Sequence, residues 1–287
     1  MNRRLLLALF VTALSLFWWW YAFGEALATV PWAQWEPTAF LGPLILIILS
    51  HALRALRLAA EFRDRITLWQ AWRLLAWHTF LVNLLPLRSG ELALPLLLHR
   101  RHCVALTRAA ATLIWLRLQD LTVLAGLLLL FWPGLLWPWR LGLLLFLAVG
   151  VLLLPLFIPL ANHLPWSVVR RMAAALALAI DETRFVWHWT IANWCVKIAA
   201  VALLFSALLA EPPAFPLLCF AALAGELGAI QPLQGVAGVG PYEGAVAAAL
   251  ALSAVPLANG IAVALAAHGL LFGVSALMAL LAGIRSR

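Results

Sequence analysis

Long apolar runs recur along this chain, and they limit what it can fold into. Crossing a bilayer takes a helix of about 20 apolar residues. Of the 287 residues, 66% are hydrophobic and 10% are charged, whereas a soluble domain is about 25% charged. The sequence therefore predicts an all-α polytopic membrane protein with a single transmembrane domain, residues 1–287. The expected spans are 4–24, 40–60, 109–131, 141–160, 187–209 and 258–281.

Two further apolar stretches are interrupted by residues that do not suit a helix in lipid. The first break, 83–91, contains a Pro, a Gly and two opposite charges, and the second, 231–244, is rich in Gly and Pro. In lipid, irregular backbone is tolerated only where protein buries it or where it lines a watery cavity. We therefore expect two re-entrant broken hairpins, at about 68–99 and 214–252.

The basic residues give an independent argument for these hairpins. If both hairpins return to the side they entered from, nearly all Arg-rich connections fall on one side, as the positive-inside rule requires of the cytoplasm. The expected location is then the bacterial inner membrane, with both termini cytoplasmic. The opposite side receives only Arg140. The cytoplasmic connections carry Arg63, Arg65, Arg73, Arg100, Arg101, Arg108, Arg170, Arg171, Arg184, Arg285 and Arg287.

The same topology contains an internal symmetry. The segment 40–131 and the segment 187–281 each consist of a span, a hairpin and a span, with opposite orientations in the membrane. The predicted fold is thus six transmembrane helices plus two opposed re-entrant hairpins in an inverted repeat. Spans 4–24 and 141–160 lie outside the repeat. Paired broken segments in two such halves point to the binding site of a transporter.

Arg88 and Glu91 lie at the tip of the first hairpin. Ionisable groups deep in a membrane are costly and are functional candidates by default. Arg88 is expected to bind an anionic head group. The alternative is an internal pair of Arg88 with Glu91 that only holds the turn.

Arg117 and Asp120 are three residues apart and share a helix face. They can pair with each other, or Asp120 can pair with Arg88 and leave Arg117 facing a cavity.

A polar stripe follows one face of the second span and includes Arg54. It predicts either a wet wall along which a charged head group moves or side chains that snorkel to the membrane surface. The residues of the stripe are His51, Arg54, Arg57 and Glu61.

In the second break, Gly238 and Gly240 allow close approach of a ligand to the backbone. Glu243 is either a cap of the following helix or an ion-coupling residue, and Glu226 is the better candidate for binding a proton or a cation. Weaker candidates are Lys197, Asn193 and His268, the last expected to be a satisfied buried histidine beside Gly269 and Gly273.

Several functional classes find no support in the sequence. The net charge of +8 comes from Arg residues scattered through short loops, so nucleic-acid binding is not expected. Three single Cys residues, no metal-ligand spacing and no nucleophile motif predict neither a metal, nor a cofactor, nor an enzyme.

Four elements occur in a fixed order: Asn83-x-x-Pro86-x-Arg88-x-Gly90-Glu91, Arg100-Arg101, Arg117-x-x-Asp120 and Gly238-Val239-Gly240-Pro241-Tyr242-Glu243. Together they resemble the transmembrane-region family of lysylphosphatidylglycerol synthase, over roughly residues 40–280. The resemblance implies a lipid-translocating membrane domain without the lysyl transferase domain. Within the matched elements, Asn83 and Tyr242 join the substrate-binding candidates.

The function expected from these features is transfer of an anionic phospholipid or polyprenyl-type lipid between leaflets. Arg88, Arg117, Arg54 and the second break would bind the head group, and Glu91, Asp120, Glu226 or Glu243 would balance or couple charge. Two alternatives stay open: a secondary transporter of a small anionic solute, and a non-transporting accessory protein that binds lipid for a membrane lipid synthase. The expected partners are membrane lipids, with a second copy of the chain or a lipid-modifying enzyme as further candidates.

Overall fold

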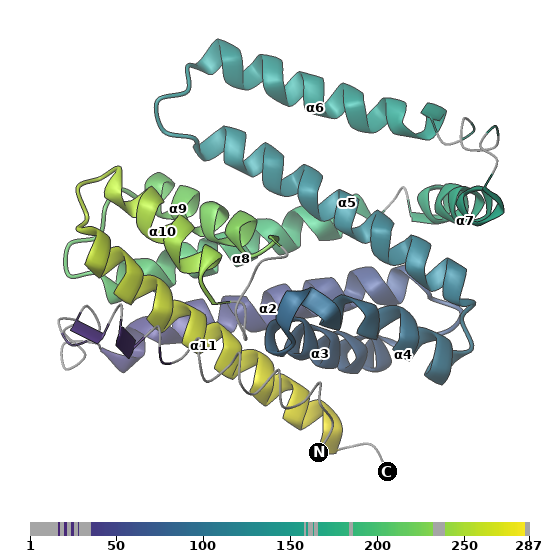
Figure 1. Ribbon diagram of the computed structural model, residues 1–287, viewed down its shortest axis with the longest axis horizontal. Coiled ribbons are helices and arrows are strands. Elements are labelled where there is room, and N and C mark those ends of the chain that lie inside the picture. The colour runs from purple at the N-terminus through teal and green to yellow at the C-terminus, as the bar shows by residue number, and fades with distance from the viewer. Residues whose placement is uncertain are drawn as a thin grey trace. The chain divides into compact units, whose positions relative to one another are not determined.

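The computed structural model describes residues 17, 20–21, 24–25, 28, 36–157, 159, 163, 166–183, 186–231 and 239–284. Its regular structure is helical throughout these residues (Figure 1), which confirms the predicted all-α class. The predicted span 4–24, apart from a few positions, and residues 232–238 of the second break lie outside the described residues. The helices are α2 (Pro37–Glu61), α3 (Leu68–Leu84), η2 (Pro86–Leu92), α4 (Ala93–His102), α5 (Leu106–Phe131), α6 (Trp137–Phe157), α7 (Ser167–Thr183), α8 (Trp187–Leu208), α9 (Phe215–Gly228), α10 (Pro241–Ala251) and α11 (Leu257–Ile284).

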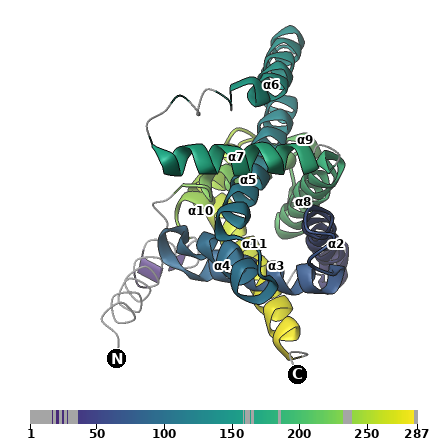
Figure 2. The same cartoon turned by 90° about the vertical axis from the view of Figure 1, so that its right-hand side faces the viewer.

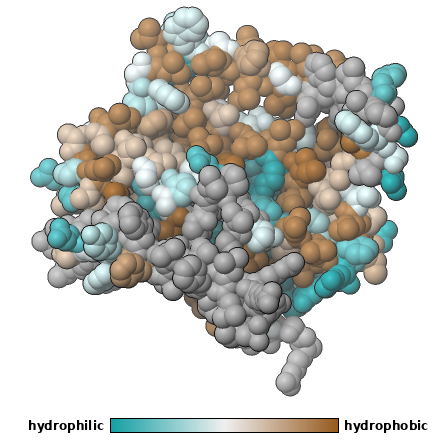
Figure 3. All heavy atoms as spheres, viewed as in Figure 1, coloured by the Kyte–Doolittle hydropathy of each residue, from teal (hydrophilic) through white to brown (hydrophobic). Residues whose placement is uncertain are grey.

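Four of the described helices, α2, α5, α8 and α11, are long and apolar enough to cross a membrane. They are the four spans predicted to flank the two hairpins. Helix α6 covers most of the predicted span 141–160, and its surface carries large exposed apolar side chains, among them Leu145 (66%), Phe146 (77%) and Leu152 (76%). Apolar atoms cover much of the face shown in Figure 3. A surface of this kind suits lipid rather than water, so the chain is a multi-pass membrane protein.

The chain divides into two compact units, and several helices contribute residues to both. Unit 1 contains Met1–Ile48, Ala76–Glu91 and Val196–Arg287, and unit 2 contains Leu49–Leu75 and Leu92–Cys195. Each unit is described by itself below.

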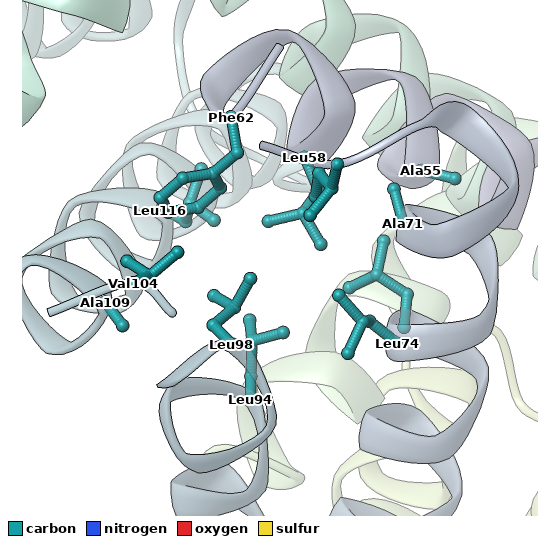
Figure 4. Packing of buried hydrophobic residues seen from close by; sticks show 12 residues of the cluster. Ala55, Leu58, Phe62, Ala71, Leu74, Leu94, Leu98, Val104, Ala109 and Leu116 are labelled. Carbon is teal, nitrogen blue, oxygen red and sulfur yellow. The ribbon is translucent and has the colours of Figure 1, made fainter. Parts of the chain in front are cut away.

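The core of unit 2 is a cluster of buried aliphatic side chains around the base of the first hairpin (Figure 4). Leu74 of α3 lies in the same cluster as Leu94 and Leu98 of α4, so the chain turns back on itself between these helices. Leu58 of α2 and Leu116 of α5 complete the contact. Lipid is as apolar as these side chains, so close van der Waals packing is what holds the hairpin against its neighbouring spans.

Both predicted breaks are the ends of helices, and both depend on a glycine that lets two backbones approach. In unit 1, a Cβ at Gly90 would lie 2.3 Å from the backbone of Leu81. A Cβ at Gly228, the last residue of α9, would lie 2.4 Å from the carbonyl oxygen of Pro241, the first residue of α10. The tip of the first hairpin is a short 3-10 helix, η2, rather than an extended break, because Pro86 suits a first helical turn.

The second hairpin is formed by α9 and α10 within unit 1. The ring of Tyr242 and the side chain of Val246 from α10 pack on Gly225 of α9, where an added Cβ would lie 2.7 Å from each. On its other side α10 contacts α11, whose Gly260 lies against Ala247.

Arg140, the one Arg that the charge pattern places on the opposite side, holds the turn between α5 and α6 together. The guanidinium group of Arg140 donates hydrogen bonds to the carbonyl oxygens of Leu130, Trp132 and Leu135, at 2.7–2.9 Å. It thereby satisfies carbonyl groups that the C-terminus of α5 leaves open. The chain then returns along α6, and α7 crosses α5 (Figure 2).

Candidate functional site

Asp120 of α5 lies at the centre of a buried polar cluster in unit 2. Its carboxylate accepts hydrogen bonds from the Arg57 guanidinium group of α2 at 2.6 Å and from the Trp194 indole of α8 at 3.0 Å. Arg117, one turn earlier on α5, pairs with the second carboxylate oxygen at 3.4 Å. Arg57 also donates to the carbonyl oxygen of Leu116 at 2.6 Å. Three helices are thus connected through one carboxylate.

Guanidinium groups outnumber carboxylates in the contacts around Asp120. Those of Arg57 and Arg117 contact its single carboxylate at 2.6 and 3.4 Å, and Arg54 of α2 is near enough to act on it electrostatically. The side chain of Arg57 is 5% exposed, whereas that of Arg117 is 33% exposed. The accessible part of the cluster is therefore cationic.

The predicted pair of Arg117 with Asp120 is confirmed. Arg88 belongs to η2, but its side chain lies outside the described residues, so its pairing with Glu91 or Asp120 stays a prediction. The sequence interpretation missed Arg57 as the main partner of Asp120, and it missed Trp194. The available signal was the position of Arg57 on the polar stripe, three residues after Arg54.

The polar stripe of α2 is packed into unit 2 rather than wet. His51, Arg57 and Glu61 are buried, and Arg54 is half-buried. His51 contacts the carbonyl oxygen of Trp72 at 3.4 Å, and Glu61 accepts hydrogen bonds from Arg108 and Thr112 at 3.3 Å each. For Arg57 the snorkelling alternative is wrong, because its side chain reaches Asp120 instead of the membrane surface.

Two uncharged contacts hold α8 against its neighbours in the same unit. The Ser50 hydroxyl donates to Asn193 at 2.7 Å, and the Thr190 hydroxyl donates to Gln119 at 3.0 Å. All four residues are buried. Asn193, a weaker candidate from sequence, thus accepts a buried hydrogen bond from α2, and its functional role stays a prediction.

At the tip of the first hairpin, unit 1 places Glu91 beside a histidine. The closest carboxylate oxygen of Glu91 lies 3.6 Å from the Nε2 atom of His78, which is buried. Asn83, in the last turn of α3, is half-buried.

The start of α10 gathers the candidates of the second break. Gly240 is the N-cap residue, with a φ of +117° that favours glycine, and its N–H donates to the Glu243 carboxylate at 2.7 Å. The predicted capping role of Glu243 is therefore present. Its other oxygen contacts the Nδ1 atom of His268 at 2.5 Å. Tyr242 is buried, and its ring lies 5.0 Å from that of His268.

Glu226 of α9 pairs with Lys197 of α8 at 2.7 Å. Its predicted coupling role stays a prediction. Gly238 lies outside the described residues. Gly269 and Gly273, expected to be a packing pair beside His268, do not lie at a close helix contact within the described residues. A Cβ added at either glycine would meet nothing within 4 Å.

The described residues contain no group of three or more His, Cys, Asp or Glu side chains placed to hold a metal ion. The contacts seen in the two clusters are ion pairs and hydrogen bonds. In unit 2 the guanidinium groups of Arg57 and Arg117 contact one carboxylate, and in unit 1 two carboxylates pair with a lysine and a histidine.

Comparison with known proteins adds the family to this geometry. The sequence pattern that defines the lysylphosphatidylglycerol synthase TM region family matches residues 5–279. The chain belongs to this family. The match covers nearly the whole chain, which confirms the resemblance found in the sequence and links the protein to membrane lipids. No curated protein and no solved structure shows significant similarity to the chain.

Proposed function

We propose that this protein moves an anionic lipid between the two leaflets of a bacterial inner membrane. The observation that carries the proposal is the cationic cluster of unit 2, in which the guanidinium groups of Arg57 and Arg117 contact the single carboxylate of Asp120. The cluster lies on α2 and α5, two helices long and apolar enough to span the membrane.

Electrostatics decides what such a cluster can bind. Each charged side chain inside a membrane is costly, and such residues mark pathways for substrates or ions. Here two guanidinium groups contact the single carboxylate of Asp120, and that of Arg117 is the more exposed of the two. Arg presents a planar fork of donors that suits phosphate. An anionic phosphate head group therefore fits the cluster, with Arg117 as its accessible contact and Arg54 as a further ligand.

We also propose a membrane topology for this transporter. Six spans and two re-entrant hairpins form an inverted repeat, with both termini in the cytoplasm. The support is that both predicted breaks are helix ends with glycine contacts at Gly90 and Gly228, and that the four helices flanking them have membrane length. The protein acts as a transporter rather than an enzyme, and its partners are anionic membrane lipids.

Leaflet-resolved transport in proteoliposomes tests the function. Vesicles would contain fluorescent phosphatidylglycerol or, as a neutral control, fluorescent phosphatidylcholine, and a membrane-impermeant quencher would report the outer leaflet. We expect the protein to move phosphatidylglycerol faster than phosphatidylcholine.

Binding of phosphatidylglycerol without transport would instead identify an accessory protein. Uptake of a small anion such as phosphate, with no lipid movement, would identify a solute transporter. Either result would overturn the proposal.

A further inference from the structure

Glu243 in unit 1 is a buried carboxylate with few means of balancing its charge. Its side chain is 4% exposed, and its two oxygens contact the Gly240 N–H and His268. The backbone N–H at a helix N-terminus stabilises a negative charge only partly. His268 is therefore the side chain that determines the net charge of the pair.

The surroundings of this pair contain no other cation available to it among the described residues. Of the helices that pack against α10, α9 contributes Glu226, which is already paired with Lys197 of α8. Helix α11 contributes His268 itself. In the same unit the Nε2 atom of His78 lies 3.6 Å from the Glu91 carboxylate, which is too long for a hydrogen bond.

Tyr242 adds an independent sign that this region is built for exchange. Its hydroxyl oxygen is buried and has no hydrogen-bond partner among the described residues, although the carboxylates of Glu226 and Glu243 are both near enough to act on it electrostatically. Its ring also contacts His268. A buried hydroxyl without a partner is costly, and it provides a donor to whatever exchanges at this place.

The contact of 2.5 Å between Nδ1 of His268 and the Glu243 carboxylate is a hydrogen bond that the ring can donate from Nδ1, and the ring can carry a second proton on Nε2. Histidine is the side chain whose charge changes near neutral pH. With one exchangeable proton the pair is neutral overall, and without it the pair carries one negative charge. The neutral form is the less costly one inside a membrane.

We propose that the Glu243–His268 pair is a binding site for one exchangeable proton that crosses the membrane together with the anionic lipid. This inference rests on the function proposed above. Binding one proton together with one singly negative lipid leaves the net charge of the protein unchanged. Protonation of Glu243 also affects the start of α10. The Gly240 N–H donates a hydrogen bond to the Glu243 carboxylate, and this hydrogen bond weakens when the carboxylate loses its charge.

Proton uptake on lipid binding tests the site without any transport. Detergent-solubilised protein in weak buffer with a pH indicator would be mixed with phosphatidylglycerol or with neutral phosphatidylcholine. We expect uptake of about one proton per bound phosphatidylglycerol, by linkage between the two sites. Glu243→Gln and His268→Gln should bind the lipid without uptake. His188→Gln, which replaces an exposed histidine of α8 in unit 2, should behave like wild type.

A pH gradient across proteoliposomes, with the membrane potential clamped, tests the coupling. For one proton per lipid, a gradient of one pH unit should drive a leaflet ratio of about tenfold, towards the alkaline side. The two pair variants should equilibrate the lipid without responding to the gradient.

The outcomes separate the two proposals. Absence of transport in wild type, with proton uptake intact, would remove the transport function and leave the proton site. Transport that ignores the gradient, or accumulates lipid on the acidic side, would contradict the coupling alone. Wild type that takes up no proton, or loss of uptake only in Glu226→Gln, would overturn the assignment to Glu243 and His268.

Discussion

Among single residues, Asp120 is the one whose carboxylate joins three helices through buried contacts. Its removal leaves Arg57, whose side chain is 5% exposed, without a carboxylate. Breaking one side of a buried ion pair costs about 3–5 kcal/mol. We therefore predict that Asp120→Asn lowers thermal stability strongly, whereas Asp64→Asn, at an exposed turn, does not.

A double variant sharpens this prediction. Replacing both Arg57 and Asp120 by apolar residues removes the buried guanidinium group together with its carboxylate, and the Arg117 that remains is 33% exposed. Such replacements of a buried pair are often neutral or stabilising. Arg57→Met with Asp120→Leu should recover most of the stability lost in Asp120→Asn. Equal stability of wild type and Asp120→Asn in a thermal melt would contradict the structural role of the pair.

The two units show which pairings a sequence can predict. Arg117 and Asp120 are three apart on one helix, so helix geometry alone brings them together. Arg57 and Asp120 are separated by 63 positions, and their contact depends on how α2 packs against α5. The same holds for Glu243 and His268, which lie on α10 and α11.

Among the helices, the ends of the second hairpin depend on a close contact between backbones. A Cβ at Gly228 would lie 2.4 Å from the Pro241 carbonyl oxygen, and overpacking of this kind costs about 1–3 kcal/mol. Gly228→Ala should therefore lower thermal stability. Gly244→Ala is the matched control in α10, where an added Cβ meets nothing within 4 Å. It should leave stability unchanged or raise it by about 0.5–1 kcal/mol, and equal effects of the two variants would contradict the contact.

Helix boundaries were predictable where Gly or Pro ends an apolar run. Helix α9 ends at Gly228, just before the predicted break 231–244, and α10 begins at Pro241, inside it. Helix α6 begins at Trp137, earlier than the predicted 141. This earlier start accompanies a tertiary contact. Arg140, in the first turn of α6, binds carbonyl groups at the end of α5.

For the whole molecule, the charge distribution predicts which loops share a side. Single Cys residues would be placed at Arg65, Arg101 and Trp137, all exposed, in a variant without Cys103, Cys195 and Cys219. Positions 65 and 101 should label from the cytoplasm and position 137 from the other side. Labelling of 65 and 101 from opposite sides would make the first hairpin a full crossing and end the inverted-repeat architecture.

The central claim is that the cationic cluster of unit 2 binds an anionic head group, and lipid binding by native mass spectrometry tests it most directly. Wild type, Arg117→Ala and Arg65→Ala would each be titrated with phosphatidylglycerol. A charge-assisted hydrogen bond contributes about 1.5–3 kcal/mol, so Arg117→Ala should bind about 10- to 150-fold more weakly. Arg65→Ala, in an exposed turn of the same unit, should bind like wild type. Equal affinity of wild type and Arg117→Ala would contradict the account.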